Sequence, residues 1–235
     1  MIIKTIILAG GLGTRISEET LDKPKPMVLL DEKPILWHVM SIYAQQGFND
    51  FVIASGYLSQ IIEDWIREAR LPWNVTCLDT GLTTQTAGRI KRVVSQFAPQ
   101  PWFVTYGDGL GNINLLNLLD NHRRNKGFVT VTAVRPPARF GSLSITNGLV
   151  RAFGEKSQSD SGWINGGFIV CDSQLLSYYS GDNESLEFDI LPRVVQSDNL
   201  MAFLHNGFWQ PMDTLRDKNY LEDLWASGNA PWKVW

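Results

Sequence analysis

The sequence predicts an α/β fold in which a mixed, mostly parallel sheet carries helices on both faces. Residues 2–8 form an apolar run that suits a strand buried on both sides. A glycine-rich segment follows at 10–13, and further apolar runs of strand length then alternate with segments of helical periodicity. Ligands of such sheets bind beyond the carboxyl ends of the strands, so the glycine-rich segment is predicted to border a binding site.

Residues 10–15, Gly-Gly-Leu-Gly-Thr-Arg, have the composition of a phosphate-binding loop. Glycines let the backbone turn sharply and approach a ligand, and their N–H groups can then face phosphate oxygens. Thr14 adds a hydroxyl donor, and the Arg15 guanidinium can hold a phosphate through two hydrogen bonds. The pattern by itself indicates phosphate binding and no particular reaction.

Residues 22–27, Asp-Lys-Pro-Lys-Pro-Met, place Lys25 between two prolines. Proline disfavours a helix at its own position and at the residue before it, so we predict an extended path that aims the lysine side chain. A surface loop with a solvated lysine is the alternative. Because the segment closely follows the glycine loop, both interpretations stay open.

Hydrophobic spacing predicts the next elements in order. Apolar residues recur at helical spacing after Pro34, and Gly47 marks the end of that helix. The patterns predict a helix between Pro34 and Gly47, a strand over 50–54, a helix with its apolar face from Leu58 to Ile66, a strand over 73–78, a short helix from Arg89 and a strand over 102–106.

Two loops that follow these strands carry further candidates. Residues 80–88 are rich in hydroxyls and small side chains ahead of a helix, a setting that can meet an anion or a base edge. An ordinary capped loop is the alternative for that segment. Asp108 lies between two glycines after the strand over 102–106, which suits a carboxylate that binds Mg²⁺ together with phosphates and water. An Asp in a tight turn is the alternative there.

Strand signals dominate the second half of the chain. Residues 147–148, Asn-Gly, predict a hairpin turn, and the glycines at 166–167 interrupt a strand where a ligand can approach. Asp213 precedes the last helix and is a second candidate carboxylate, although it or Thr214 also suits an N-cap. The predicted elements are strands over 129–134, 142–145, 149–153 and 163–170, helices over 173–179 and 187–196, and a final helix with Leu215, Leu221, Leu224 and Trp225 on its apolar face.

Composition limits the class of protein. Hydrophobic residues make up 44%, the net charge is −3, and no apolar run reaches membrane-spanning length. We therefore expect a soluble cytoplasmic protein that binds neither membranes nor nucleic acid. Cys77 and Cys171 are the only cysteines, which favours a reducing compartment over a disulfide framework. The nine tryptophans are interpreted as core packing in preference to sugar stacking. Because the sequence shows no repeat or linker, residues 1–235 are predicted to form a single domain.

Five charged residues form the candidate reaction centre, namely the cations Arg15, Lys25 and Lys156 and the carboxylates Asp108 and Asp213. Such a set suits phosphoryl or nucleotidyl transfer, which needs charge neutralisation over several phosphates more than covalent help. An attacking phosphate is mostly ionised at neutral pH and needs no general base. The three histidines accordingly show no triad or metal-ligand spacing.

Two motifs, residues 8–15 and 23–27, resemble those of the sugar-1-phosphate nucleotidyltransferases. Further stretches resemble specifically the bacterial glucose-1-phosphate cytidylyltransferase branch, and these are 105–109, 139–141, 164–168 and 207–218. The resemblance runs from end to end. It implies a Rossmann-like fold, a Mg²⁺ cofactor, a homo-oligomer, and the reaction of CTP with α-D-glucose 1-phosphate to give CDP-glucose and pyrophosphate. It also implies a place in dideoxyhexose synthesis for surface polysaccharide such as lipopolysaccharide O-antigen.

The resemblance also implies roles by position. The nucleotide-binding half would cover about 1–125 and the sugar-phosphate-binding half about 126–235. Arg15, Lys25 and Asp108 would be catalytic, and Asp108 and Asp213 would hold the metal. The nucleotide-binding residues would be Leu8, Ala9, Gly10, Gly11, Gly13, Thr14, Arg15, Lys25, Thr80, Gly81, Thr86, Gly88 and Asp108. The sugar-phosphate-binding residues would be Gly141, Glu155, Lys156, Asn165 and Gly166, with Lys156 on the phosphate.

The chain departs from the family pattern at Ala87, where the family has glycine, and at Ser157, where it has proline. The segment between Trp65 and Trp73 is also shorter than in the family, which concerns subunit contacts more than chemistry. A transferase that uses UTP or dTTP, or another hexose 1-phosphate, is the alternative enzyme. A nonenzymatic nucleotide-sugar sensor is the alternative of another class, and a dinucleotide oxidoreductase is disfavoured because the glycine spacing is not G-x-G-x-x-G.

Overall fold

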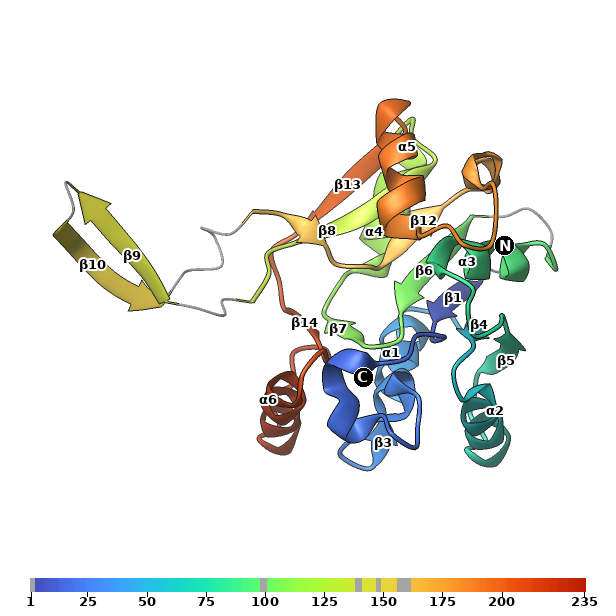
Figure 1. Cartoon of the computed structure of the whole chain (residues 1–235), viewed down its shortest axis with the longest axis horizontal. Coiled ribbons are helices and arrows are strands. Elements are labelled where there is room, and N and C mark those ends of the chain that lie inside the picture. Colours follow the sequence, from blue (N-terminus) through green and yellow to red (C-terminus); the bar gives the residue numbers. More distant parts are fainter. Residues whose placement is uncertain (1–2, 98–100, 138–140, 147–148, 156–161) are drawn as a thin grey trace.

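The computed structural model describes residues 3–97, 101–137, 141–146, 149–155 and 162–235, and a central sheet organises them (Figure 1). In the described residues, its strands from one edge to the other are β11 (Ile164–Asn165), β8 (Val129–Val134), β12 (Ile169–Cys171), β6 (Trp102–Tyr106), β1 (Thr5–Leu8), β4 (Asp50–Ser55) and β5 (Asn74–Asp79). An eighth strand, β13 (Leu200–His205), pairs with β8. Helices pack against both faces of the sheet. The predicted α/β class is therefore confirmed.

Four strands from the first half of the chain form the parallel part of the sheet. Ile7 of β1 lies opposite Ile53 of β4 on one side and Thr105 of β6 on the other. Parallel strands present their carboxyl ends at one edge, so the loops that follow them meet there. The strands are β1 (Thr5–Leu8), β4 (Asp50–Ser55), β5 (Asn74–Asp79) and β6 (Trp102–Tyr106), all close to the predicted ranges.

Alternate side chains of β1 enter two different cores. Ile7 packs into the core on one face, whereas Ile6 and Leu8 pack into the core on the other, as the pleat of a strand requires. The first face is covered by α1 (Ile35–Ala44), α2 (Ser59–Glu68), α4 (Leu115–Arg124) and α6 (Leu215–Ala226), and the second by α3 (Thr86–Val94) and α5 (Leu191–Gln196).

The second half of the chain adds a mixed part to the sheet. Strand β8 (Val129–Val134) runs parallel to β13 (Leu200–His205) and antiparallel to β11 (Ile164–Asn165) and β12 (Ile169–Cys171). The interrupted strand predicted over 163–170 is thus confirmed, and its two parts are β11 and β12. The break carries left-handed backbone at Gly167, with φ of 73°, and at Phe168, with φ of 47°.

Several elements differ from the sequence-based expectation. The predicted helix over 187–196 consists of a π-helical turn, η5 (Leu186–Ile190), followed by α5, and the predicted helix over 173–179 is the 3₁₀ segment η4 (Ser173–Tyr178). Helix α3 begins at Thr86, three residues before the predicted start. Helix α4, strand β13 and the short ladder of β7 (Gly109–Gly111) with β14 (Trp209–Pro211) were not predicted.

The predicted hairpin in the second half is present as an antiparallel pair of its own, β9 (Gly141–Thr146) with β10 (Leu149–Glu155). It projects away from the central sheet at the left of Figure 1. The predicted turn at 147–148 lies outside the described residues. The hairpin is the only described part that stands apart from the body of the molecule in this view.

The segment around Lys25 does not follow the extended path that its prolines predicted. Pro24 is extended, but a single 3₁₀ turn, η2 (Lys25–Met27), follows directly, with the Val28 N–H donating to the Lys25 carbonyl at 3.0 Å. Proline in the first turn of a helix lacks only an N–H that would have no intrahelical partner, which is why Pro26 is tolerated there. The neighbouring elements are η1 (Thr14–Glu19), β2 (Leu29–Leu30) and β3 (Lys33–Pro34).

The tryptophans that contact other aromatic rings pack around the end of α1 that carries Trp37 and His38. The His38 ring makes edge contacts with Trp225 and Trp232, and Trp37 contacts Trp73 and Trp235. This arrangement agrees with the packing interpretation of the tryptophans. None of the helices in the described part of the chain has the length and apolar character needed to cross a bilayer.

Candidate active site

A cavity of about 810 Å³ opens at the carboxyl edge of the parallel strands. Its walls are the glycine loop, the turn at Lys25, the 82–86 segment and the end of β6. Ten of the residues predicted to bind nucleotide line it, namely Leu8, Ala9, Gly10, Gly11, Gly13, Thr14, Arg15, Lys25, Thr86 and Asp108. The volume suits a small-molecule ligand better than a macromolecule.

Four charged side chains at or beside this cavity are joined in one network. The Lys25 ammonium donates to Asp108 Oδ2 at 2.5 Å and to Asp213 Oδ1 at 2.6 Å. Arg15 donates to the other oxygen of Asp213 at 2.6 Å. Lys25 is only 10% exposed, whereas Arg15 is 71% exposed. The structure thus brings together four of the five predicted charged groups, and the fifth, Lys156, lies outside the described residues.

The glycine loop and Lys25 are packed against one another. Gly13 has φ of 68°, and a Cβ built on it would lie 3.1 Å from Lys25 Cβ and 3.0 Å from Thr20 Cγ2. The Thr20 hydroxyl donates to the Gly13 carbonyl at 3.1 Å, and this hydrogen bond stabilises the glycine loop. A side chain at Gly13 would therefore be disfavoured both by its φ and by the space available.

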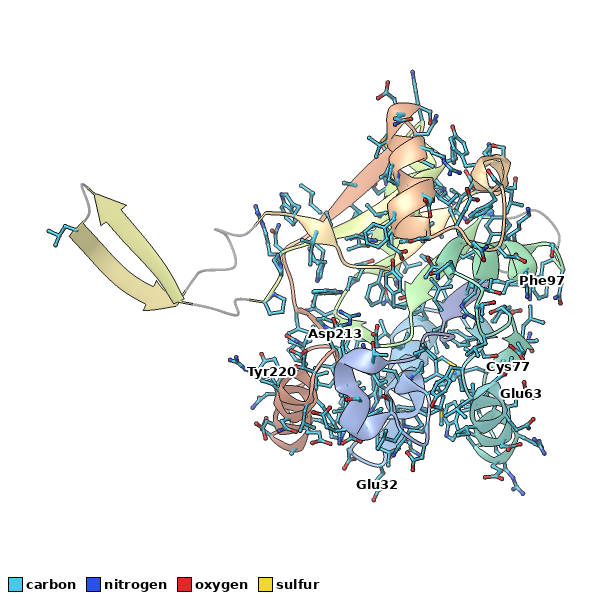
Figure 2. The ribbon with its side chains drawn as sticks, in the orientation of Figure 1. Glu32, Glu63, Cys77, Phe97, Asp213 and Tyr220 are labelled. Atoms are coloured by element: carbon cyan, nitrogen blue, oxygen red, sulfur yellow. The ribbon has the colours of Figure 1, made fainter. Side chains whose placement is uncertain are left out.

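The two aspartates are brought together by backbone pairing between distant segments. Strand β7 begins directly after Asp108 and pairs with β14, and the Met212 N–H donates to the Asp108 carbonyl at 2.9 Å. Asp213 follows at once and lies beside η1, near the middle of the molecule (Figure 2). The N-cap of α6 is Thr214, which forms a capping box with Asp217. Asp213 is therefore not the cap, and its carboxylate is left to pair with the cations.

Arg89 is a site residue that the sequence reasoning missed. Its buried guanidinium donates to the Gly10 carbonyl at 3.0 Å, the Ser55 carbonyl at 2.7 Å and the Thr80 hydroxyl at 2.6 Å. One side chain thus joins the carboxyl end of β4 to the segments that follow β1 and β5. A Cβ on Gly10 would lie 2.1 Å from Arg89 Cζ, so this glycine makes room for the guanidinium. Burial lowers the pKa of Arg89, and Asp79 opposes that shift.

Three predicted nucleotide-binding residues lie behind the cavity wall. Thr80 is fully buried and bonds to Arg89 and Ser55, and the Gly81 N–H donates to Asp79 at 2.8 Å. A Cβ on Gly88 would lie 2.6 Å from the Asp182 carbonyl, so this glycine lets α3 approach the backbone of another segment. These residues support the wall and do not line it. Ala87, which departs from the family pattern, lies on the buried face of α3.

The predicted sugar-phosphate residues are described only in part. Asn165 and Gly166 lie at the break between β11 and β12, where the Gly166 carbonyl accepts a hydrogen bond from the Trp209 indole at 2.8 Å. Gly141 and Glu155 pair with each other at the base of the β9–β10 hairpin. Lys156 and Ser157 lie outside the described residues. Trp209 was not predicted as a site residue, although it belongs to the motif at 207–218.

Asp108 and Asp213 are the residues whose chemistry suits a metal ion. In the described ranges, no three His, Cys, Asp or Glu side chains gather closely enough for a metal site made by protein alone. Mg²⁺ is commonly bound by one or two carboxylates, with phosphates and water completing its shell. The two aspartates already converge on a single cation, the Lys25 ammonium, so their oxygens fit that mode of binding.

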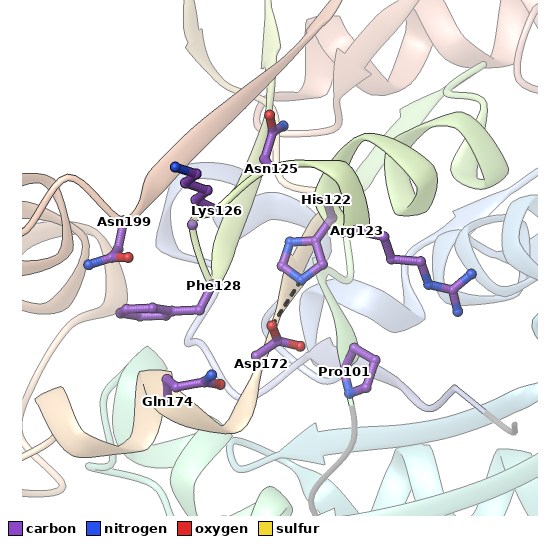
Figure 3. A pocket seen from close by; sticks show the side chains of 10 residues that line it. Pro101, His122, Arg123, Asn125, Lys126, Phe128, Asp172, Gln174 and Asn199 are labelled. Atoms are coloured by element: carbon purple, nitrogen blue, oxygen red, sulfur yellow. Dashed lines mark ion pairs between the residues drawn. The ribbon is translucent and has the colours of Figure 1, made fainter.

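A second cavity, of about 460 Å³, lies beside the C-terminal end of α4 (Figure 3). His122 and Asp172 face each other there at 3.4 Å, and the His122 ring also bonds to the Thr130 hydroxyl at 2.9 Å. Burial lowers the pKa of His122 more than Asp172 raises it. The cations Arg123 and Lys126 line this cavity next to the last turn of a helix, where positive charge is ordinarily favourable. None of the predicted site residues lines it.

Known proteins resemble this chain over nearly its whole length. A sequence profile described as nucleotidyl transferase matches residues 4–222. Glucose-1-phosphate cytidylyltransferase from Salmonella typhimurium is 44% identical over 256 residues, which cover 99% of this chain and 100% of the relative. Probable glucose-1-phosphate cytidylyltransferase from Bacillus subtilis is 35% identical over 255 residues, which cover 99% of this chain and 100% of the relative.

Solved structures support the same fold at lower identity. The crystal structure of HddC from Yersinia pseudotuberculosis complexed with GMP-PN has a TM-score of 0.76 at 24% identity, covering 95% of this chain and 99% of that one. The inositol-1-phosphate CTP transferase from T. maritima has a TM-score of 0.72 at 16% identity, covering 100% and 99%. The profile and the two relatives establish the family: the chain is an enzyme of the nucleotidyl transferase family.

Proposed function

We propose that this enzyme transfers the cytidylyl group of CTP to α-D-glucose 1-phosphate, forming CDP-glucose and releasing pyrophosphate. The observation that carries the proposal is the shared pairing of Lys25 with Asp108 and Asp213 at the edge of the glycine-loop cavity. Cations and carboxylates gathered at a phosphate loop suit phosphoryl chemistry. The choice of cytosine and glucose is supported by the two relatives, which carry the name glucose-1-phosphate cytidylyltransferase.

In the proposed reaction, a phosphate oxygen of glucose 1-phosphate attacks the α-phosphorus of CTP. The bond from the α-phosphorus to the oxygen that bridges the α- and β-phosphates breaks, and pyrophosphate leaves with the electron pair. The attacking phosphate is already mostly ionised at neutral pH, so no side chain has to remove a proton. The described site agrees with this, because the charged side chains that line the cavity are Arg15, Lys25, Arg89 and Asp108, and no histidine lines it.

We assign the neutralisation of phosphate charge to the protein groups at the cavity. Arg15 is exposed enough to reach the β- and γ-phosphates, and Lys25 lies at the junction between the glycine loop and the aspartates. Backbone N–H groups of the glycine loop supply further donors. Asp108 and Asp213 would hold Mg²⁺, which when bound neutralises phosphate charge and helps the pyrophosphate to leave. Fixed charges of this kind contribute to catalysis by preorganisation.

A substrate panel tests the proposal. Pyrophosphate release is measured with CTP, UTP, dTTP and GTP, each against glucose, galactose and mannose 1-phosphates, and the nucleotide-sugar product is identified by its mass. We expect CTP with glucose 1-phosphate to give the highest kcat/KM. A preference for another nucleotide or hexose phosphate would overturn the assignment of substrates, and nucleotide binding with no pyrophosphate release from any pair would favour a sensor.

We further propose that the enzyme acts as a homo-oligomer in the cytoplasm and feeds the synthesis of surface polysaccharide. The support is the resemblance to a family with that role. Light scattering coupled to gel filtration measures the oligomeric state directly. A single species at the mass of one chain, 26.5 kDa, would contradict the oligomer.

A further inference from the structure

The Glu187 carboxylate bonds to two side chains that line the cavity, Thr86 and Tyr106, which lie 101 and 81 positions away from it in the sequence. One oxygen, Oε1, accepts a short hydrogen bond from the Tyr106 hydroxyl. The other, Oε2, accepts from the Thr86 hydroxyl at 2.8 Å and from the Ser185 hydroxyl at 2.8 Å. Tyr106 and Thr86 both line the cavity, whereas Glu187 lies on η5 behind them. The carboxylate therefore acts from outside the cavity on two side chains that face it.

This carboxylate is held by neutral donors. Among the described residues Glu187 forms no ion pair, and three hydroxyl groups occupy most of its acceptor positions. Burial and the adjacent Glu187 raise the pKa of Tyr106, so its hydroxyl keeps its proton at neutral pH. The direction of the hydrogen bond is thus defined, with tyrosine as donor and carboxylate as acceptor.

Tyr106 continues the chain of hydrogen bonds into the second half of the protein. The Asn165 amide donates to the Tyr106 hydroxyl at 3.4 Å, and the Asn165 side-chain carbonyl accepts from the Gly167 N–H at 3.0 Å. The Tyr106 ring also packs closely on this break in the strand, because a Cβ on Gly167 would lie 2.8 Å from its Cδ2. Tyr106 itself lies two residues before Asp108 at the end of β6.

We propose that Tyr106 and Glu187 are positioning residues that set the Asn165 amide, and with it the segment at 165–167, against the nucleotide cavity. The inference rests on the proposed function and on the sugar-phosphate contacts of Asn165 and Gly166 that the family resemblance implies. Tyr106 is the link because its hydroxyl accepts from Asn165 while it donates to Glu187. The Tyr106 hydroxyl bonds to Glu187 and Asn165 and to none of the charged groups assigned to the triphosphate, so its loss is expected to act mainly on the orientation of the acceptor substrate.

The Tyr106→Phe variant removes one hydroxyl and leaves the ring that packs on Gly167. We expect the KM for glucose 1-phosphate to rise about tenfold, as for the loss of one hydrogen bond, while the KM for CTP and the melting temperature stay near the wild-type values. Glu187→Gln keeps the size of the side chain and is expected to raise the same KM. Tyr178→Phe is the matched control, because the Tyr178 hydroxyl bonds to Ser197 at an exposed position away from the cavity.

A double-mutant cycle separates this role from general stability. If Tyr106 acts through Asn165, Tyr106→Phe has little further effect on the KM for glucose 1-phosphate in an Asn165→Ala background. Effects that multiply, or a rise in the KM for CTP as large as that for the sugar phosphate, overturn the inference. A fall in melting temperature with kcat reduced and both KM values unchanged also overturns it. A wild-type enzyme that does not turn over this substrate pair is a different result and refutes the proposed function.

Discussion

Lys25 and Asp108 form an ion pair at 2.5 Å, although 83 positions separate them in the sequence. The same ammonium also pairs with Asp213 at 2.6 Å, so two carboxylates share one buried cation. A single missing partner would leave an uncompensated charge in a poorly solvated place. Lys25, Asp108 and Asp213 therefore compensate one another's charge, and a substitution of one is expected to change the electrostatics of the other two.

Removal of the Lys25 charge is expected to abolish most of the activity. Lys25→Met keeps much of the aliphatic packing but leaves Asp108 and Asp213 facing each other, and it removes a donor for phosphate oxygens. We expect kcat to fall by about a hundredfold or more, as for the loss of other preorganised donors. Steady-state kinetics of pyrophosphate release measure it. Lys23→Met serves as the control from the same segment, and equal losses in both variants would argue against a special role of Lys25.

Neutralising either aspartate is expected to weaken metal binding. Asp108→Asn and Asp213→Asn each remove one of the two charges proposed to hold Mg²⁺, so more metal should be needed for half-maximal activity and kcat should fall by about a hundredfold. Calorimetric titration of Mn²⁺ in the presence of CTP provides a readout that does not depend on turnover. Asp223→Asn, an exposed change on α6, is the control. Unchanged Mn²⁺ affinity in Asp213→Asn would remove that residue from the metal site.

Gly10 and Gly11 are expected to respond differently to the same substitution. A Cβ at Gly10 would collide with the Arg89 guanidinium, whereas a Cβ at Gly11 would have no atom within 4 Å. Gly10→Ala must displace a buried charge from its hydrogen-bond acceptors, so we expect it to destabilise the protein by about 2 kcal/mol or more, and Gly11→Ala to change stability little. Urea denaturation measures both free energies of unfolding. Equal values for the two variants would contradict the supporting role of Arg89.

His38 is expected to make stability depend on pH. It is fully buried among tryptophans, and burial lowers its pKa to about 4, while the Leu30 carbonyl and Asp31 oppose the shift and Lys233 adds to it. The unfolded chain takes up a proton at His38 below about pH 6.5, whereas the folded protein does so only near pH 4. With respect to His38, the folded protein therefore keeps its full stability above pH 6.5 and loses stability as the pH falls from 6.5 toward 4. The slope is at most about 1.4 kcal/mol per pH unit.

Urea denaturation at pH 7.5 and pH 5 tests this expectation with wild type and His38→Phe. The variant should lose less stability on acidification than the wild type. His122 and His205 also have lowered pKa values and contribute in the same direction, so part of the pH dependence remains in the variant. An identical loss of stability in both proteins would show that His38 is not the titrating group.

Local patterns in the sequence were sufficient for most of the elements that build the sheet. The apolar runs of β1, β4 and β6 and the helical spacing of α1 carry their own signals, because burial on both faces or on one stripe leaves a period in the sequence. Helix α4 carries the same kind of signal, since Leu115, Leu118 and Leu119 share its buried face. Strand β13 is a short apolar run that has no distinguishing period.

The sequence by itself therefore determined the α/β class, the phosphate-type loop at 10–15 and the candidate carboxylates, because each depends on residues that are close together in the chain. Only the tertiary structure decided that Lys25 turns in a 3₁₀ segment to join Asp108 and Asp213, that Arg89 lies beneath Gly10, and that Glu187 reaches Thr86 and Tyr106. These contacts join segments separated by about 80 to 190 positions, and they depend on which strands pair and which surfaces are buried. No local pattern encodes that pairing, so the electrostatics of the site emerges only when the sheet has formed.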